Sequence, residues 1–219
     1  MSNFRNWTLT KLNKRFQLER LIEMPLLREW ISAAKTEISE TDRYFLHRIQ
    51  ENLIENLYNW NEQELSTGFI GPILAWVKFT DKYSNLFEER AFVGVVEGEE
   101  LSGEPDAMIA WGRDEPEKPF FCFNEYKKEI DPNGDPVGQC LAAMLAAESI
   151  NEYRYPIYGM YVAGQNWHFM VLKNKQYAVS PPYSATTDKI VEIYQNLLWL
   201  KARIKEIVKE ELTLKNEIK

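Results

Sequence analysis

Two acidic residues and a lysine stand at the ends of neighbouring apolar runs in the middle of the chain. Asp106 begins the run D-A-M-I-A-W, and Glu125 and Lys127 end the run P-F-F-C-F-N-E-Y-K. Alternate residues of a strand share a face, so Glu125 and Lys127 are expected to point the same way. The polar turn between the two runs predicts a hairpin that places Asp106 across from Glu125.

These residue types suit the hydrolysis of a phosphodiester assisted by a divalent metal. Carboxylate oxygens such as those of Asp106 and Glu125 bind hard cations, including Mg²⁺. A lysine beside them can orient a water molecule or stabilise the negative charge that develops on a phosphate. A Lewis acid, a positioned water and a charge clamp are the parts that the reaction requires. Replacement of Lys127 is therefore expected to impair chemistry and leave the melting temperature nearly unchanged.

A simpler interpretation is that these charges form a solvated strand end. In that case Glu125, Lys127, Lys128 and Glu129 face water, and Asp106 is a turn residue after a proline. The run F-F-C-F is apolar on both faces, which predicts a strand buried on both sides. A strand of that kind does not normally end in a Glu-x-Lys without a function, which favours the catalytic interpretation.

The order of these residues resembles the signature of the PD-(D/E)XK nucleases, a superfamily with a restriction-endonuclease-like fold. The matching residues are Pro105-Asp106 and Glu125-Tyr126-Lys127, and the resemblance covers about residues 60 to 180. More narrowly, E-Y-K-K-E, G-D-P-V-G-Q-C-L-A-A-M and Y-G-M-Y-V-A-G-Q-N-W are similar to segments of uncharacterised bacterial proteins with this core. The resemblance implies Mg²⁺ or Mn²⁺ as cofactor, Lys127 as the helper of the attacking water, and Asp106, Glu125 and Tyr126 among the metal ligands.

Two further residues are candidates for the same site, each with an alternative. Gln139 lies in the first turn of a predicted helix, where the resemblance implies a hydrogen bond to a phosphate or to the attacking water. It would otherwise be a polar residue in an exposed turn. Glu64 lies three residues after Asn61, the spacing of a capping box. The resemblance instead implies that an acidic residue on this helix approaches the metal, and both interpretations of Glu64 stay open.

Composition limits the classes of protein that the chain can belong to. The 219 residues are 45% hydrophobic, which supports a real core, and the formal net charge of −7 disfavours a protein that coats nucleic acid by bulk electrostatics. Cys122 and Cys140 are expected to be reduced core thiols. The chain begins M-S-N-F-R-N-W, without a signal peptide, and has no apolar run of membrane-spanning length, so a cytoplasmic location without a membrane partner is expected.

The order of predicted elements indicates an α/β fold. Residues 1–60 are predicted as an N-terminal helical region, and residues 61–219 as a restriction-endonuclease-like core with a central mixed sheet flanked by helices. In this core, residues 91–97, 106–112 and 119–127 are expected to form a three-stranded meander. Asp135 and Pro136 fit the start of the crossover helix. A long helix is expected at residues 186–214.

The predicted activity is Mg²⁺-dependent hydrolysis of nucleic acid, with DNA favoured as substrate. The rival prediction is a nuclease fold that serves as a binding or assembly module, or one that cleaves only inside a larger complex. A homodimer or a larger protein complex therefore stays open. Apolar periodicity at both ends of the chain predicts a seam between the N-terminal and C-terminal helices, within the chain or between chains.

Overall fold

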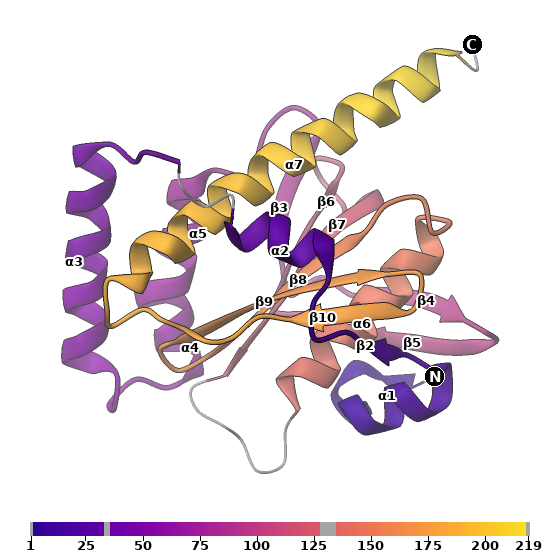
Figure 1. Ribbon diagram of the computed structural model, residues 1–219, viewed down its shortest axis with the longest axis horizontal. Coiled ribbons are helices and arrows are strands. Elements are labelled where there is room, and N and C mark those ends of the chain that lie inside the picture. The colour runs from indigo at the N-terminus through magenta and orange to yellow at the C-terminus, as the bar shows by residue number, and fades with distance from the viewer. Residues whose placement is uncertain (1, 33–35, 128–134, 218–219) are drawn as a thin grey trace.

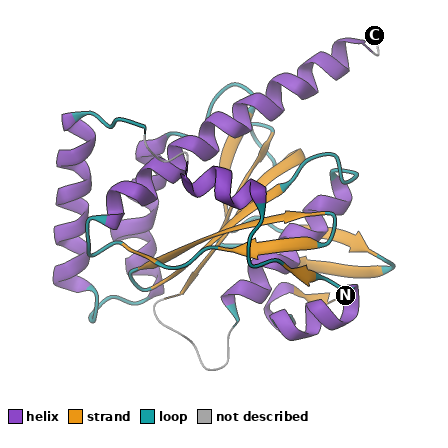
Figure 2. Ribbon diagram, in the orientation of Figure 1, coloured by secondary structure: helices purple, strands orange, loops and turns teal. Residues whose placement is uncertain are grey.

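The architecture is a large mixed sheet with helices on both faces, and a smaller sheet beside it (Figures 1 and 2). The computed structural model describes residues 2–32, 36–127 and 135–217. The expected α/β class with a central mixed sheet flanked by helices is confirmed.

The strands are β1 (Ser2–Asn3), β2 (Glu19–Arg20), β3 (Ser84–Glu88), β4 (Phe92–Val96), β5 (Glu99–Gly103), β6 (Ala107–Trp111), β7 (Glu117–Lys127), β8 (Ile157–Ala163), β9 (Asn166–Lys173), β10 (Gln176–Val179) and β11 (Tyr183–Ser184). The α-helices are α1 (Leu9–Phe16), α2 (Pro25–Ser32), α3 (Glu40–Asn56), α4 (Glu62–Leu65), α5 (Gly71–Val77), α6 (Pro136–Ile150) and α7 (Lys189–Glu217). A 3₁₀ turn, η1 (Phe4–Asn6), follows β1, and a π-helical turn, η2 (Ser66–Ile70), joins α4 to α5.

The large sheet has the order β2-β10-β9-β8-β7-β6-β3, with β11 paired to β9. The crossover through α6 makes β8 parallel to β7. Asp135 caps α6 by accepting a hydrogen bond from the Gly138 N–H at 2.9 Å, and Pro136 is the first helical residue. The small sheet has the order β1-β5-β4.

The expected meander of three strands is wrong. Strand β4 pairs with β5 in the small sheet, and the place beside β6 is taken by β3. The connection from β4 to β5 is a two-residue turn in which Glu97 has φ 50° and Gly98 has φ 80°. Positive φ at both central residues is the hairpin geometry whose twist matches the flanking strands. This turn directs β4 back onto β5 and away from β6.

The N-terminal segment is built into the rest of the fold. It contains the helices α1, α2 and α3, but β1 also pairs with β5 and β2 pairs with β10. The start of α1 touches the start of α6, because the Leu9 N–H donates to Asp135 Oδ2 at 2.7 Å. A Cβ on Gly138 would lie only 2.7 Å from the Trp7 carbonyl oxygen, so this close approach requires glycine.

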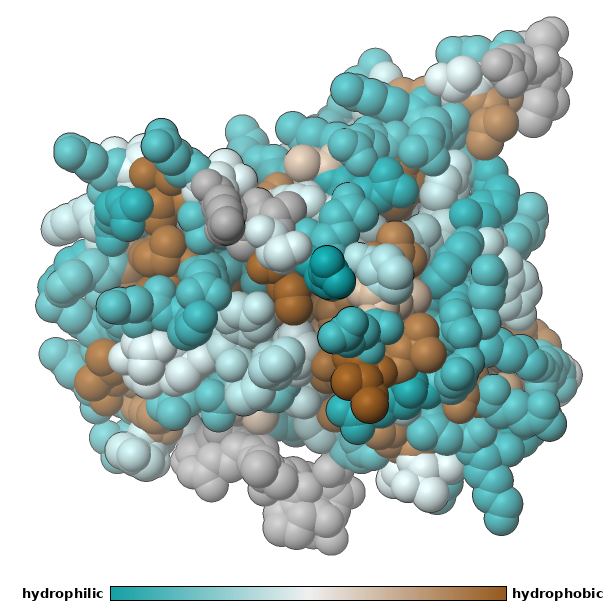
Figure 3. Space-filling model, in the orientation of Figure 1, coloured by the Kyte–Doolittle hydropathy of each residue, from teal (hydrophilic) through white to brown (hydrophobic). Residues whose placement is uncertain are grey.

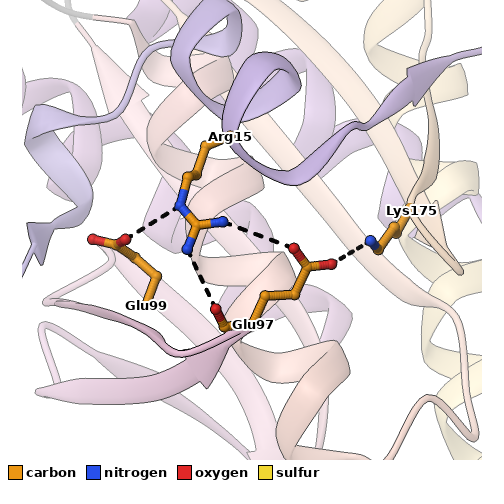
Figure 4. A network of polar contacts seen from close by, with 4 residues as sticks. All are labelled: Arg15, Glu97, Glu99 and Lys175. Atoms are coloured by element: carbon orange, nitrogen blue, oxygen red, sulfur yellow. Dashed lines mark hydrogen bonds and ion pairs between the residues drawn. The ribbon is translucent and has the colours of Figure 1, made fainter.

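An ion-pair network also holds α1 against the two sheets (Figure 4). Arg15 of α1 lies 3.3 Å from Glu99 and 3.8 Å from Glu97, both at the β4–β5 turn. Lys175, in the turn between β9 and β10, reaches the same Glu97 carboxylate. The network therefore joins three segments that are far apart in the sequence.

Each face of the large sheet carries its own apolar layer. Helices α1 and α6 cover one face, and α2, α3, α5 and α7 cover the other. In the second layer Trp30 of α2 stacks on Trp199 of α7 at 6.0 Å between ring centroids and donates from Nε1 to the Asn196 carbonyl at 2.9 Å. The predicted seam between N-terminal and C-terminal helices thus lies within the chain. The end of α7 projects beyond the body of the molecule (Figure 1).

The surface is mainly hydrophilic on the face shown in Figure 3, with apolar patches over α3 and near β2. In the segment after β2 and in and just after α3, the large exposed side chains are Ile22, Tyr44, Ile54 and Tyr58. Across the described residues, no helix combines the length and the apolar character that crossing a lipid bilayer requires.

Candidate active site

The antiparallel pairing of β6 and β7 brings Asp106 to the end of β7. Ala107 lies opposite Asn124, so Asp106, one residue earlier, reaches the level of the next residues of β7. Its Oδ2 accepts a hydrogen bond from the Tyr126 N–H. The predicted hairpin between the two apolar runs is therefore confirmed, although the register shifts near its turn.

Lys127 is held between two carboxylates. Its Nζ lies 3.1 Å from Glu125 Oε1 and 3.2 Å from Glu62 Oε1. The Glu125 side chain is 8% exposed and that of Lys127 is 15% exposed. This pair is therefore largely removed from water, and the solvated strand end that was the simpler interpretation does not describe Glu125 or Lys127. Lys128 and Glu129 lie outside the described residues.

Burial dominates the electrostatics of the acidic pair. It raises the pKa of Glu125 to about 7, and the nearby charge of Asp106 adds to this shift while Lys127 opposes it. Burial also raises the pKa of Asp106, against the hydrogen bond from Tyr126 and the charge of Lys127. For Lys127, burial lowers the pKa, but Glu125 and Asp106 outweigh it and the net shift is upward. Lys127 is therefore an ammonium at neutral pH.

Glu64 closes the capping box that the sequence suggested. The Asn61 N–H donates to Glu64 Oε2 at 2.7 Å, and the Glu64 N–H donates to Asn61 Oδ1 at 2.9 Å. The residue of this helix that reaches Lys127 is Glu62, which the sequence analysis did not single out. The capping box could have pointed to Glu62. The box uses the Glu64 side chain at the helix start, so the acid of this helix that can reach the strands is Glu62, at the first helical position.

Gln139 is buried in the first turn of α6, with 6% of its surface exposed. The alternative of an exposed polar turn residue is therefore wrong. Within the described part of the chain, its side chain makes no hydrogen bond to Asp106, Glu125 or Lys127. A role for Gln139 in binding phosphate or water stays a prediction.

A cavity of about 510 Å³ opens beside Asp106. It is lined by Glu62, Gln63, Ser66, Glu88, Glu89, Asp106 and Tyr126. Glu88 and Glu89 come from the end of β3, a strand that the sequence analysis missed. Four of the seven lining residues are acidic, so the cavity attracts positive charge and repels phosphate.

The residues present fit a magnesium ion held mainly by water and substrate. Glu125 supplies a buried carboxylate and Asp106 a half-buried one, at adjoining strand ends. Mg²⁺ commonly uses one or two carboxylates and keeps several waters. In residues 2–32, 36–127 and 135–217, no group of three or more His, Cys, Asp or Glu side chains is placed to hold one metal ion. These described residues therefore do not form a metal site in which protein side chains supply all the ligands.

The comparisons with known proteins do not place the chain in a family. No protein-family model matches the sequence, and no curated protein sequence matches it. The resemblance to the nuclease superfamily stays a prediction carried by the residues of the site.

Proposed function

We propose that the chain hydrolyses phosphodiester bonds of nucleic acid, DNA foremost, with Mg²⁺ or Mn²⁺, and that its sheet is a restriction-endonuclease-like core. The observation that supports the proposal is the convergence of Asp106, Glu125 and Lys127 at the ends of β6 and β7. A buried and a half-buried acid beside a lysine match the needs of metal-assisted phosphodiester hydrolysis.

In this proposal the acidic side chains bind the metal and the lysine binds the phosphate. Asp106 and Glu125 would hold the metal, with the backbone at Tyr126 as a neighbouring ligand. When bound, the metal supplies a Lewis acid and lowers the pKa of a bound water. Lys127 stays protonated, so it acts as a hydrogen-bond donor and charge clamp toward the scissile phosphate and not as a base. Glu62 holds the Lys127 ammonium on the cavity side.

The test is cleavage of single-stranded DNA, double-stranded DNA and RNA with Mg²⁺ or Mn²⁺, and with chelator as the blank. Asp106→Asn and Glu125→Gln should abolish metal-dependent cleavage. Lys127→Ala should lower its rate about a hundredfold or more, the cost of losing one preorganised stabiliser of about 3 kcal/mol. The matched control is Lys189→Ala, which removes a lysine from an exposed ion pair with Glu192. Cleavage that survives in Asp106→Asn would refute the proposal.

The rival is a nuclease-fold module that binds or assembles without cleaving. The acidic lining of the cavity favours it, because four acidic side chains, Asp106 among them, oppose the approach of a phosphate backbone unless a cation intervenes. If the parent protein cleaves no substrate but retains a bound partner in pull-down and sizing experiments, the module is the better description.

A further inference from the structure

The row of side chains that contains Glu125 continues across two more strands. Strands β7, β8 and β9 are neighbours in the large sheet (Figure 1). Glu125 of β7 is paired with Tyr161 of β8, and Tyr161 is paired with His168 of β9. Paired residues of adjacent strands point to the same face, and neighbouring strands lie about 4.8 Å apart. Tyr161 therefore stands one strand spacing from Glu125, and His168 stands two.

This row lies on the face of the sheet that α1 and α6 cover. A Cβ on Gly159, two residues before Tyr161, would lie 2.5 Å from the Met144 sulfur of α6. Alternate residues of a strand share a face, and Tyr161 accordingly packs against the apolar layer that contains α6. Tyr126, which bounds the cavity beside Asp106, belongs to the layer on the opposite face. The row therefore extends the site away from that cavity, over β8 and β9.

The two rings of Tyr161 and His168 are held in place, and each leaves one polar atom available. The rings are stacked, with centroids 4.3 Å apart and an interplanar angle of 6°. His168 Nδ1 lies 3.2 Å from the Ser180 carbonyl oxygen, which can only accept, so Nδ1 carries the proton. Burial lowers the pKa of His168, so the ring is neutral at pH 7 and Nε2 presents a lone pair. Within residues 2–32, 36–127 and 135–217, neither Nε2 nor the Tyr161 hydroxyl has a hydrogen-bond partner, and neither is a fully buried atom.

An accepting nitrogen beside a phenol hydroxyl fits a ligand hydroxyl better than a phosphate. Neutral His168 Nε2 has no proton to donate, so it repels a phosphate oxygen and accepts from an O–H group. The Tyr161 hydroxyl can donate, so one ligand hydroxyl could donate to Nε2 and accept from Tyr161 at the same time. Lys127, by contrast, is charged and follows Glu125 on the same face, so the proposed phosphate belongs at that end of the row.

We propose that Tyr161 and His168 bind the sugar next to the scissile phosphate through one of its hydroxyl groups. The inference rests on the proposed function, because it takes the phosphate to lie beside Glu125 and Lys127. The sugar is bonded directly to that phosphate, so a place one or two strand spacings away suits it. Every ribose of RNA carries a 2′-hydroxyl, whereas a DNA strand offers a free hydroxyl only at its ends. The site should therefore prefer RNA, or the end of a DNA strand, over the interior of a DNA strand.

The experiment is fluorescence anisotropy of labelled oligonucleotides, with phosphorothioate linkages that resist cleavage, added to the full chain in Mg²⁺. The probes are RNA, 2′-O-methyl RNA, DNA with a 3′-hydroxyl and DNA with a 3′-dideoxy end. RNA, or DNA with its 3′-hydroxyl, should bind about fivefold more tightly than its blocked counterpart, the worth of one hydrogen bond. His168→Phe and Tyr161→Phe keep a flat ring in the stack and should each remove this preference. His47→Phe and Tyr44→Phe, which replace exposed residues of α3, are the matched controls and should keep it.

The outcomes separate this inference from the nuclease proposal. Preference for RNA over 2′-O-methyl RNA would assign the 2′-hydroxyl, and preference for the 3′-hydroxyl would assign the end of a DNA strand. Equal binding of each probe and its blocked counterpart, or no binding of any probe, would overturn the inference. A preference that survives in both His168→Phe and Tyr161→Phe would overturn it too, because the stacked pair would then only stabilise the sheet. A protein that cleaves without any hydroxyl preference refutes this inference alone, and one that shows the preference but cleaves nothing refutes the nuclease proposal alone.

Discussion

Replacing Lys127 by alanine should destabilise the fold in a strongly pH-dependent way. The side chain of Lys127 is 15% exposed and its partner Glu125 is 8% exposed, so the variant leaves a carboxylate buried beside Asp106. Removing one partner of a buried pair usually costs about 3–5 kcal/mol. Glu125 can avoid this cost by taking up a proton, because its pKa is already about 7 in the parent.

The sign follows from the proton balance of the two states. In the parent, the folded pKa of Glu125 is raised above its ordinary value of 4.5, so stability falls as pH rises from about 4.5 to about 7 and is flat above. Without Lys127 the folded pKa moves higher, and the loss of stability continues above pH 7. Each further pH unit then costs about 1.4 kcal/mol in the variant and nothing in the parent. The deficit of Lys127→Ala should therefore be small at pH 7 and grow to about 2–3 kcal/mol at pH 9.

The assay is urea unfolding followed by tryptophan fluorescence between pH 6 and pH 9, with chelator present throughout. Lys189→Ala serves as control, because its exposed pair should give no trend with pH. A deficit that stays constant over this range would refute the coupling between Lys127 and Glu125. The expected pH dependence also revises the prediction from sequence that Lys127→Ala leaves the melting temperature nearly unchanged. That prediction should hold only below about pH 7.

Three further predictions concern the elements that position the site. Asn61→Ala removes the cap of α4 and should lower the free energy of unfolding by about 1 kcal/mol in urea titrations, without a change in β-sheet circular dichroism. Gly94→Ala would put a Cβ 2.8 Å from the Ala146 Cβ, so it should separate β4 from α6 and cost about 1–3 kcal/mol; an unchanged melting temperature would contradict this packing. Glu148, fully buried and accepting from the Asn174 N–H at 2.6 Å, has a pKa that burial raises. Its ionisation destabilises the fold as pH rises above about 4.5, so Glu148→Gln should be more stable than the parent at pH 7, and the advantage should vanish at pH 4.

The core of the fold was predictable because its signals are strong and local. Strand β7 is apolar on both faces, α6 begins at an Asp-Pro pair, and β8 follows a crossover of the length that parallel pairing needs. These features place Asp106, Glu125 and Lys127 at one end of the sheet. The positions of these three candidate residues in the strands were therefore enough to predict that they lie close together.

Strands β3 and β5 and the role of Glu62 could not be predicted, because they depend on contacts between segments far apart in the sequence. Strand β3 reads S-N-L-F-E and β5 reads E-E-L-S-G, and neither short polar stretch has the alternation of a half-buried strand. Without β3, the acids at its end could not be assigned to the site. Glu62 was missed for a related reason, because its partner Lys127 is 65 residues away and only the packing of α4 on the sheet brings them together.

Folding alone does not explain why Glu125 is buried beside the half-buried Asp106. Shifting the pKa of Glu125 from 4.5 to about 7 means that the ionised form costs about 3 kcal/mol, a large fraction of the stability of an ordinary domain. An apolar pair at the same strand ends would remove this cost. A bound cation removes it as well, because positive charge beside the carboxylates favours their ionised form. The metal binding proposed above would recover the free energy lost in burying Glu125 beside Asp106, and this gain is an argument for that proposal.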